Sequence, residues 1–304
     1  MSNHPSSSPA IKTVALSKSF GKKQALDGLS LTIESPSITG LLGRNGAGKT
    51  TLLKLCAGLM SKSSGNLEIW GQVPLNNLNV LAQLIYSHSD LSYSGGLKLK
   101  TIVSDHQLMY PNFDQAFAMG LLDYFSLDLD KKYTSLSRGG QSTFNFVCAL
   151  AARTPLTMLD EPSLGMDVTV RKAAFEILLR EQSEHPRVFI VASHLISEIE
   201  NLLDSVLIID EGKLILHDSI ENIRERAYFL EGERAALEAF TTDKNVIFRN
   251  DAELRSSVVV LEPITEQLAN VAQSTGLSVG ALRPEELYIY LTRENKEGEL
   301  ECLW

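Results

Sequence analysis

The chain has 304 residues, of which 44% are hydrophobic and 21% are charged, as is ordinary for a globular protein. That length allows two domains or one large domain. A formal net charge of -9 argues against a broad nucleic-acid-binding surface. No apolar run approaches the roughly 20 residues of a membrane-spanning helix, and no signal peptide is visible. The three cysteines are widely spaced, which predicts no metal site and suits a reducing cytoplasm.

The chain begins with a tail rich in Ser and Pro, residues 1–9, that we expect to be disordered. Apolar runs beyond the tail predict short strands at residues 11–16, 29–33, 38–42, 67–70 and 84–86. A helix-forming run at residues 51–58 follows the third of these strands. A buried strand, a glycine-rich segment and a helix therefore follow one another near the start of the predicted domain.

A helical insertion is predicted at about residues 91–152, with helical patterns at residues 101–110, 114–125 and 137–152. Beyond it the chain alternates again, with a strand at residues 156–159, a helix at 168–182 and a strand at 188–192. Residues 206–209 and 213–216 form a predicted hairpin over Glu211-Gly212. Strands that alternate with helices predict an α/β domain with a largely parallel sheet, which we place at residues 10–226.

Residues 227–304 differ in character and predict a small accessory α+β domain. Strand patterns occur at residues 228–230, 246–248, 258–261 and 277–281, and helical patterns at 233–240, 263–274 and 284–291. The order β-α-β-β-α-β plus a last helix is compatible with a ferredoxin-like module. We expect this domain to extend the structure, while docking of a regulator or binding of a small ligand stays open.

The segment from Gly43 to Thr51 fits the pattern of a phosphate-binding loop, in which two glycines separated by four residues precede Lys-Thr. Glycines let backbone N–H groups turn toward phosphate oxygens, and the following helix N-terminus favours anions. Lys49 supplies a full charge for the β- and γ-phosphates, and the Thr50 hydroxyl suits Mg²⁺. A chance match is expected in roughly one chain in a hundred of this length, so we expect a nucleoside triphosphate site. The residues assigned to this loop are Gly43, Arg44, Asn45, Gly46, Ala47, Gly48, Lys49, Thr50 and Thr51.

Two carboxylates, Asp160 and Glu161, follow the apolar strand at residues 156–159. A strand-end aspartate is suited to the Mg²⁺ shell, and a carboxylate beside it is suited to orient or deprotonate a water. An isolated Asp-Glu pair is more often a solvated turn. Because this pair follows a buried strand in a chain that has a phosphate-binding loop, we favour the nucleotide-site interpretation.

A third motif opens the helix predicted at residues 137–152. Ser137 suits an N-cap, and Gly139 and Gly140 allow a second backbone to approach closely. Alone, this pattern would predict only the start of a helix. Placed shortly before Asp160-Glu161, it resembles the signature motif of ATP-binding cassette (ABC) ATPases. Over about residues 11–226 the chain resembles the nucleotide-binding subunit of an ABC transporter.

This resemblance implies an ABC-type P-loop NTPase domain that binds and hydrolyses ATP with Mg²⁺. It implies that Glu161 is the catalytic glutamate, that His194 is the switch histidine and that Phe20 stacks on adenine. Residues 163–167 match the D-loop. A lone histidine is more often structural and a lone phenylalanine more often core, but their places in the motif order favour the functional roles.

The resemblance also implies partners and a location. In this family two cassettes pair head to tail, so the signature residues would complete the ATP site of a second copy in a homodimer. These residues are Ser137, Gly139 and Gly140. A separately encoded transmembrane permease would be driven from the inner face of the cell membrane, and no nucleic-acid partner is expected. Residues 110–114 and 193–200 resemble bacterial exporter ATPases of the ABC-2 kind.

One departure from the family pattern concerns a glutamine expected after the strand at residues 84–86, where this chain has Ser87-His88-Ser89-Asp90. We expect Ser89 or Asp90 to substitute for it near Mg²⁺, with Ser89 as the candidate ligand. Two alternatives stay open at this point: a soluble ABC-type ATPase that acts on ribosomes or DNA, and a regulatory subunit. The missing glutamine favours the regulatory subunit. The four intact residues of the expected chemistry argue against it: Lys49, Asp160, Glu161 and His194.

Overall fold

The computed structural model describes residues 8–34, 36–93, 96–193, 199–251 and 256–292. The chain forms two compact units, Met1–His217 and Asp218–Trp304. The division lies ahead of the predicted boundary at residues 226/227, because helix α7 (Ile220–Arg226) contacts helix α10 (Pro284–Thr292) of the second unit. Most of the predicted N-terminal tail, residues 1–7, lies outside the described residues.

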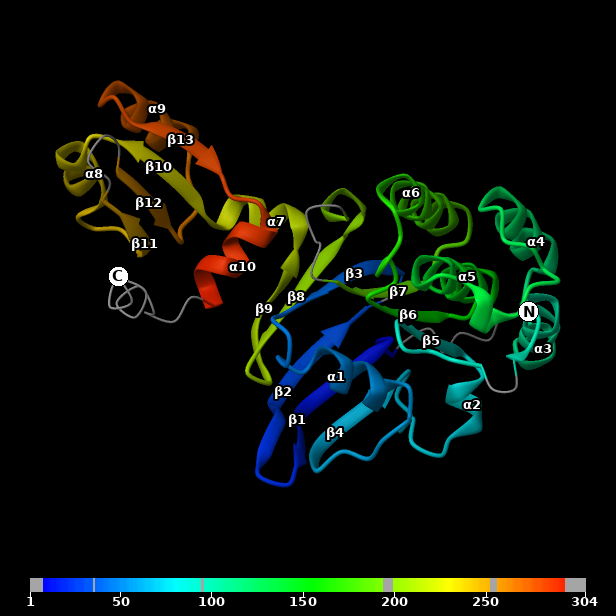
Figure 1. Cartoon of the computed structure of the whole chain (residues 1–304). Helices are drawn as coiled ribbons and strands as arrows, with labels where there is room; N and C mark the ends of the chain where they lie inside the picture. Colours follow the sequence, from blue (N-terminus) through cyan, green and yellow to red (C-terminus); the bar gives the residue numbers. More distant parts are fainter. Residues whose placement is uncertain (1–7, 35, 94–95, 194–198, 252–255, 293–304) are drawn as a thin grey trace. The chain divides into compact units, whose positions relative to one another are not determined.

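A six-stranded sheet forms the centre of the first unit (Figure 1). In spatial order its strands are β5 (Leu84–His88), β6 (Leu156–Asp160), β7 (Val188–Ala192), β3 (Ser37–Leu42), β8 (Ser205–Asp210) and β9 (Lys213–Ser219). The pairs β5–β6, β6–β7, β7–β3 and β3–β8 are parallel, so the predicted parallel sheet is confirmed. Every residue of β6 and β7 is buried, because helices and the second sheet cover the two faces. Glu211 and Gly212 both have positive φ, as the tight β8–β9 hairpin turn requires.

A second, antiparallel sheet has the order β2-β1-β4, with β1 (Ile11–Phe20), β2 (Lys23–Ile33) and β4 (Ser64–Ile69). Helix α1 (Lys49–Cys56) lies between the two sheets, where Leu52 and Leu53 join one hydrophobic core with residues of both (Figure 1). The sequence predicted shorter forms of β1 and β2. Their outer ends are partly exposed and lack an apolar alternation, and the strands continue there through pairing that runs as far as Phe20 with Lys23. The short helix α2 (Leu78–Leu81) precedes β5.

The helical insertion consists of α3 (Leu99–Met109), α4 (Gln115–Tyr124), a 3-10 turn at Tyr133–Ser135 and α5 (Arg138–Ala151). It has its own hydrophobic core, in which Phe144 and Val147 of α5 pack against Leu99, Ile102 and Leu122. The helix α6 (Val168–Glu184) packs against α5. The predicted insertion is thus present as a distinct helical layer beside the central sheet.

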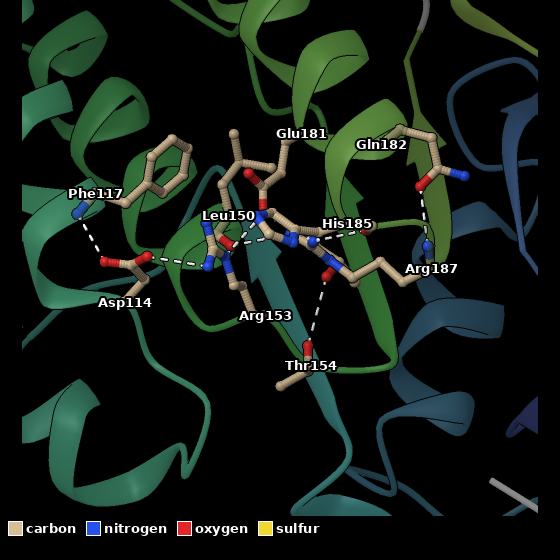
Figure 2. Close-up of polar contacts among 10 residues, drawn as sticks. Asp114, Phe117, Leu150, Arg153, Thr154, Glu181, Gln182, His185 and Arg187 are labelled. Atoms are coloured by element: carbon tan, nitrogen blue, oxygen red, sulfur yellow. Dashed lines mark hydrogen bonds and ion pairs between the residues drawn. The ribbon is translucent and has the colours of Figure 1, made fainter. Parts of the chain in front are cut away.

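Ion pairs tie the ends of α4, α5 and α6 together at the side of the sheet where β6 and β7 begin (Figure 2). Glu181 of α6 is 3% exposed, and its Oε1 lies 2.9 Å from Nη1 of Arg187 and 3.1 Å from Nε of Arg153. Arg153 Nη1 also lies 2.9 Å from Asp114 Oδ2, at the N-cap of α4. Arg187 Nη2 donates to the carbonyl of Leu150 over 2.9 Å. Two carboxylates therefore balance two guanidinium groups, and the buried Glu181 pairs with both of them.

The second unit is a four-stranded antiparallel sheet with the order β11-β12-β10-β13. Strands β10 and β11, which α8 connects, are separated by β12, and this is the split β-α-β arrangement of the predicted ferredoxin-like module. Its buried core includes Tyr228, Leu230, Leu237, Val258 and Val260. The elements are β10 (Tyr228–Gly232), α8 (Arg234–Thr241), β11 (Val246–Asn250), β12 (Ser256–Val260), α9 (Glu266–Ser274) and β13 (Ser278–Ala281).

Candidate nucleotide-binding site

The predicted phosphate-binding loop connects the carboxyl end of β3 to the N-terminus of α1, which begins at Lys49. Gly46 and Gly48 have φ angles of 87° and 113°, a region that residues with a side chain rarely adopt. Gly48 is also confined, since a Cβ atom there would lie 2.5 Å from the carbonyl oxygen of Ala25. These glycines let the loop wrap the start of α1, where unpaired backbone N–H groups favour an anion.

A cavity of about 480 Å³ opens beside this loop. It is lined by Phe20, Lys23, Ala25, Arg44, Asn45, Gly46, Gly48, Lys49, Thr50, Thr51, Asp160 and Glu161. Three basic side chains and two carboxylates therefore line the same cavity. That balance suits a polyphosphate that arrives with a divalent cation. Gly43 and Ala47 belong to the loop but are buried behind the lining.

Lys49 is only 7% exposed and folds back onto its own loop. Its Nζ donates to the carbonyl oxygens of Gly43 and Arg44 over 2.5 and 3.4 Å. Burial lowers the pKa of Lys49 below its ordinary value, while the carboxylates of Glu161 and Asp160 act in the opposite direction. The loop thus holds the Lys49 ammonium group at the place where phosphate oxygens would replace these two carbonyl oxygens as hydrogen-bond acceptors.

Asp160 ends β6 and is 5% exposed. Its Oδ2 accepts two hydrogen bonds, from Thr50 Oγ1 over 2.7 Å and from the hydroxyl of Tyr86 over 3.0 Å. A hydroxyl and a carboxylate side by side are the hard oxygen donors that Mg²⁺ prefers, and Mg²⁺ usually takes only one or two protein carboxylates beside phosphate. In the described part of the chain, no group of three or more His, Cys, Asp or Glu side chains gathers as a metal site. The donor set fits Mg²⁺ that is held jointly with a nucleotide.

Glu161 follows Asp160 directly and has a φ of 53°, which is strained for a residue with a side chain. Its N–H donates to the carbonyl of Ala192 over 2.8 Å, and this bond fixes the turn at the end of β6. The side chain lines the cavity. The strained turn therefore places Glu161 beside the phosphate-binding loop.

The signature residues do not line this cavity. Ser137 caps α5, and its Oγ accepts a hydrogen bond from the N–H of Gly140 over 3.1 Å. Gly139 packs on the D-loop, since a Cβ atom there would lie 2.2 Å from the carbonyl oxygen of Gly165. Ser142 Oγ also donates to the carbonyl of Leu164 over 2.7 Å. The signature motif and the D-loop of one chain thus form one unit, separate from that chain's own cavity.

Three further predicted residues have different outcomes. Phe20 ends β1, is 51% exposed and lines the cavity, with Lys18 Nζ 5.0 Å from the centre of its ring. His194 lies outside the described residues. Ser89 lies in the turn after β5 and is not among the residues that line the cavity.

Comparison with known proteins decides the family. The family profile described as ABC transporter matches residues 26–164. The ABC transporter ATP-binding protein YtrB of Bacillus subtilis (strain 168) is 30% identical over 234 residues, which cover 77% of this chain and 78% of that protein. The chain belongs to the ABC transporter ATP-binding proteins.

Other relatives of this ABC protein agree with that assignment. The bacitracin transport ATP-binding protein BcrA of Bacillus licheniformis is 30% identical over 227 residues, which cover 72% of each chain. A dimeric ATP-binding cassette solved in a post-hydrolysis state with ADP and phosphate has the same fold, with a TM-score of 0.59 at 18% identity and coverage of 69% of this chain and 98% of that one. The ABC protein described here accordingly binds ATP and is an ATPase. No helix among its described residues combines the length and apolar character needed to cross a bilayer.

Sequence reasoning missed two residues of the ABC site. Lys23 lines the cavity because it pairs with Phe20 across the β1–β2 turn. The short turn at Gly21-Lys22 in the sequence indicates that Phe20 and Lys23 lie close together. Tyr86 bonds to Asp160 from the neighbouring strand, and only the register of β5 against β6 reveals that contact.

Proposed function

We propose that this ABC protein is the ATP-hydrolysing subunit of an exporter, that it works as a homodimer, and that it drives a separate transmembrane permease. One observation carries the proposal: Lys49, the Thr50–Asp160 pair and Glu161 converge on one cavity at the carboxyl ends of β3 and β6. A relative named for bacitracin transport and the ABC-2-like segments at residues 110–114 and 193–200 support export. Relatives named for transport also favour this proposal over an ATPase that acts on ribosomes or DNA.

The predicted site residues have the following proposed roles. Lys49 and the loop N–H groups bind the phosphates, and Phe20 stacks on the adenine. Thr50 and Asp160 hold Mg²⁺, which when bound neutralises charge on the β- and γ-phosphates. Glu161 accepts a proton from the attacking water, and its position at the end of a buried strand keeps it close to that water. His194, which lies outside the described residues, would sense the γ-phosphate, as the family resemblance implies.

The second copy supplies the other half of each site. Ser137, Gly139 and Gly140 lie at an N-terminus of a helix, which favours anions, and they are outside their own chain's cavity. In a head-to-tail pair they would contact the γ-phosphate bound by the other subunit. ATP then holds the two copies together, and they separate after hydrolysis. The relative solved as a dimer with ADP and phosphate supports the pairing of two copies.

The proposal places the protein on the cytoplasmic face of the cell membrane, attached to its permease. The test is to tag the chain in its native host, separate membrane from soluble fractions, extract with a mild detergent and identify co-purifying proteins by mass spectrometry. We expect a membrane-bound complex with one polytopic protein. Recovery with ribosomes or DNA, or as a soluble protein without a membrane partner, would contradict the proposal.

A further inference from the structure

We propose that Tyr86 is a positioning residue that fixes the Asp160 carboxylate for the metal–nucleotide complex. This inference rests on the proposed function, in which Asp160 serves Mg²⁺. Tyr86 lies within strand β5, so this strand itself contacts the carboxylate that is proposed to bind the metal. The candidate considered from the sequence, Ser89, lies beyond the end of that strand.

The sheet register explains how the contact arises. The Cα partner of Tyr86 on β6 is Met158, and Asp160 lies two residues further along the same strand. Side chains two residues apart on a strand share one face of the sheet. A tyrosine is long enough to pass from its own position to that of Asp160, and its hydroxyl lies 3.0 Å from Oδ2.

The ring of Tyr86 is held in this position by its neighbours. It stacks on His88 with a centroid separation of 5.0 Å and an interplanar angle of 28°. It is partly buried and packs against the core between the two sheets. In this contact the Tyr86 hydroxyl donates and the Asp160 carboxylate accepts.

The two donors to Asp160 Oδ2 are not equivalent. Thr50 is exposed, lines the cavity and can turn its hydroxyl toward a bound cation. Tyr86 is not among the residues that line the cavity. When Thr50 turns to the cation, Tyr86 is the donor that keeps the Asp160 carboxylate in place. Hydrogen bonds that orient a metal-binding carboxylate typically contribute 10- to 100-fold in metal affinity.

The test compares Tyr86→Phe with the wild-type full chain. The variant keeps the ring and its stacking on His88 and removes only the hydroxyl. Affinity for a fluorescent non-hydrolysable ATP analogue is measured in EDTA, and affinity for Mn²⁺ is then measured by electron paramagnetic resonance with the analogue bound. We expect unchanged affinity for the metal-free nucleotide and a loss of about 10-fold in Mn²⁺ affinity.

Two further variants make the result decisive. Tyr93→Phe removes another tyrosine hydroxyl, one that faces His106 in the helical insertion, and should leave Mn²⁺ affinity unchanged. Asp160→Asn should lose most of the Mn²⁺ affinity. If Asp160→Asn loses the metal but Tyr86→Phe binds it as the wild type does, the inference is wrong and the proposed function stands. If Asp160→Asn keeps wild-type affinity, both the inference and the proposed metal role of Asp160 are wrong.

Discussion

Thr50 donates a hydrogen bond of 2.7 Å to Asp160, a residue 110 positions further along the chain. Thr50 lies in α1, which follows β3, and Asp160 is the last residue of β6. Strand β7 separates β3 from β6 in the sheet. Parallel strands bring their carboxyl ends to one edge, so loops that are distant in sequence meet there. The cavity is therefore made by the sheet as a whole, and each motif supplies only part of it.

Lys49→Ala should weaken ATP binding by at least about 10-fold, because a charge that is aimed at the phosphates is lost from a low-dielectric site. Titration with a fluorescent nucleotide measures this affinity. Lys131→Ala is the matched control, since that lysine is exposed in the helical insertion. Equal affinity of Lys49→Ala and wild type would count against the site.

Gly48→Ala should destabilise the nucleotide-free protein much more than Gly46→Ala. Both positions have positive φ, which costs a residue with a side chain about 1 kcal/mol. Only at Gly48 does the added Cβ also collide with backbone, the carbonyl oxygen of Ala25, whereas nothing lies within 4 Å at Gly46. Urea denaturation of the two variants measures the difference. Equal losses would show that the loop relaxes freely around position 48.

The strand–loop–helix motif and the Asp160-Glu161 pair could be predicted from the sequence, because both depend on local residue order. The contact of Tyr86 with Asp160 could not be predicted in this way. It depends on which strand neighbours β6 and in what register, and a tyrosine in an apolar strand is equally typical of core packing. The place of Lys23 at the cavity could not be predicted either, because the predicted strand did not include this residue. Its pairing with Phe20 is set by the β1–β2 hairpin.

The order of elements in the second unit was predictable because each helix and strand has its own apolar pattern. The boundary of this unit was not predictable, because α7 continues directly from β9 and its place in the second unit depends on tertiary contact with α10. The separate antiparallel sheet of β1, β2 and β4 was also missed. Part of each strand is visible as an apolar run, but the partners of the strands are set by tertiary packing on α1.

Glu181→Gln should lower the free energy of unfolding by about 3 kcal/mol, because it leaves Arg187 buried without its counter-charge (Figure 2). Arg153 keeps Asp114 as a partner, so the loss is centred on Arg187. Asp130→Asn is the control, since its ion pairs with Lys98 and Lys100 are exposed, and we expect little change. Urea denaturation of both variants tests this. A comparably small effect at Glu181 would mean that the pair is solvated.

His106 should make stability fall in mild acid. Burial lowers the pKa of His106 to about 4, with Asp105 acting in the opposite direction, and Tyr93 is its hydrogen-bond partner. Between about pH 6.5 and about pH 4, this histidine binds a proton in the unfolded chain but stays neutral in the folded chain. The free energy of unfolding therefore decreases as the pH falls through that range. Between about pH 7 and about pH 5 the wild type should lose about 2 kcal/mol more than His106→Gln. Urea denaturation of both proteins at both pH values measures this difference. If the wild type and His106→Gln lose the same free energy of unfolding between the two pH values, His106 is not buried in its neutral form.

The most direct test of the account uses Glu161→Gln, which should bind ATP, hydrolyse it poorly and so remain in the closed dimer. Light scattering after size-exclusion chromatography should give 33.5 kDa without nucleotide and twice that mass with ATP and Mg²⁺. Adding Lys49→Ala to the same chain should restore the single mass. If Glu161→Gln binds ATP and stays at the single mass, the head-to-tail site is wrong.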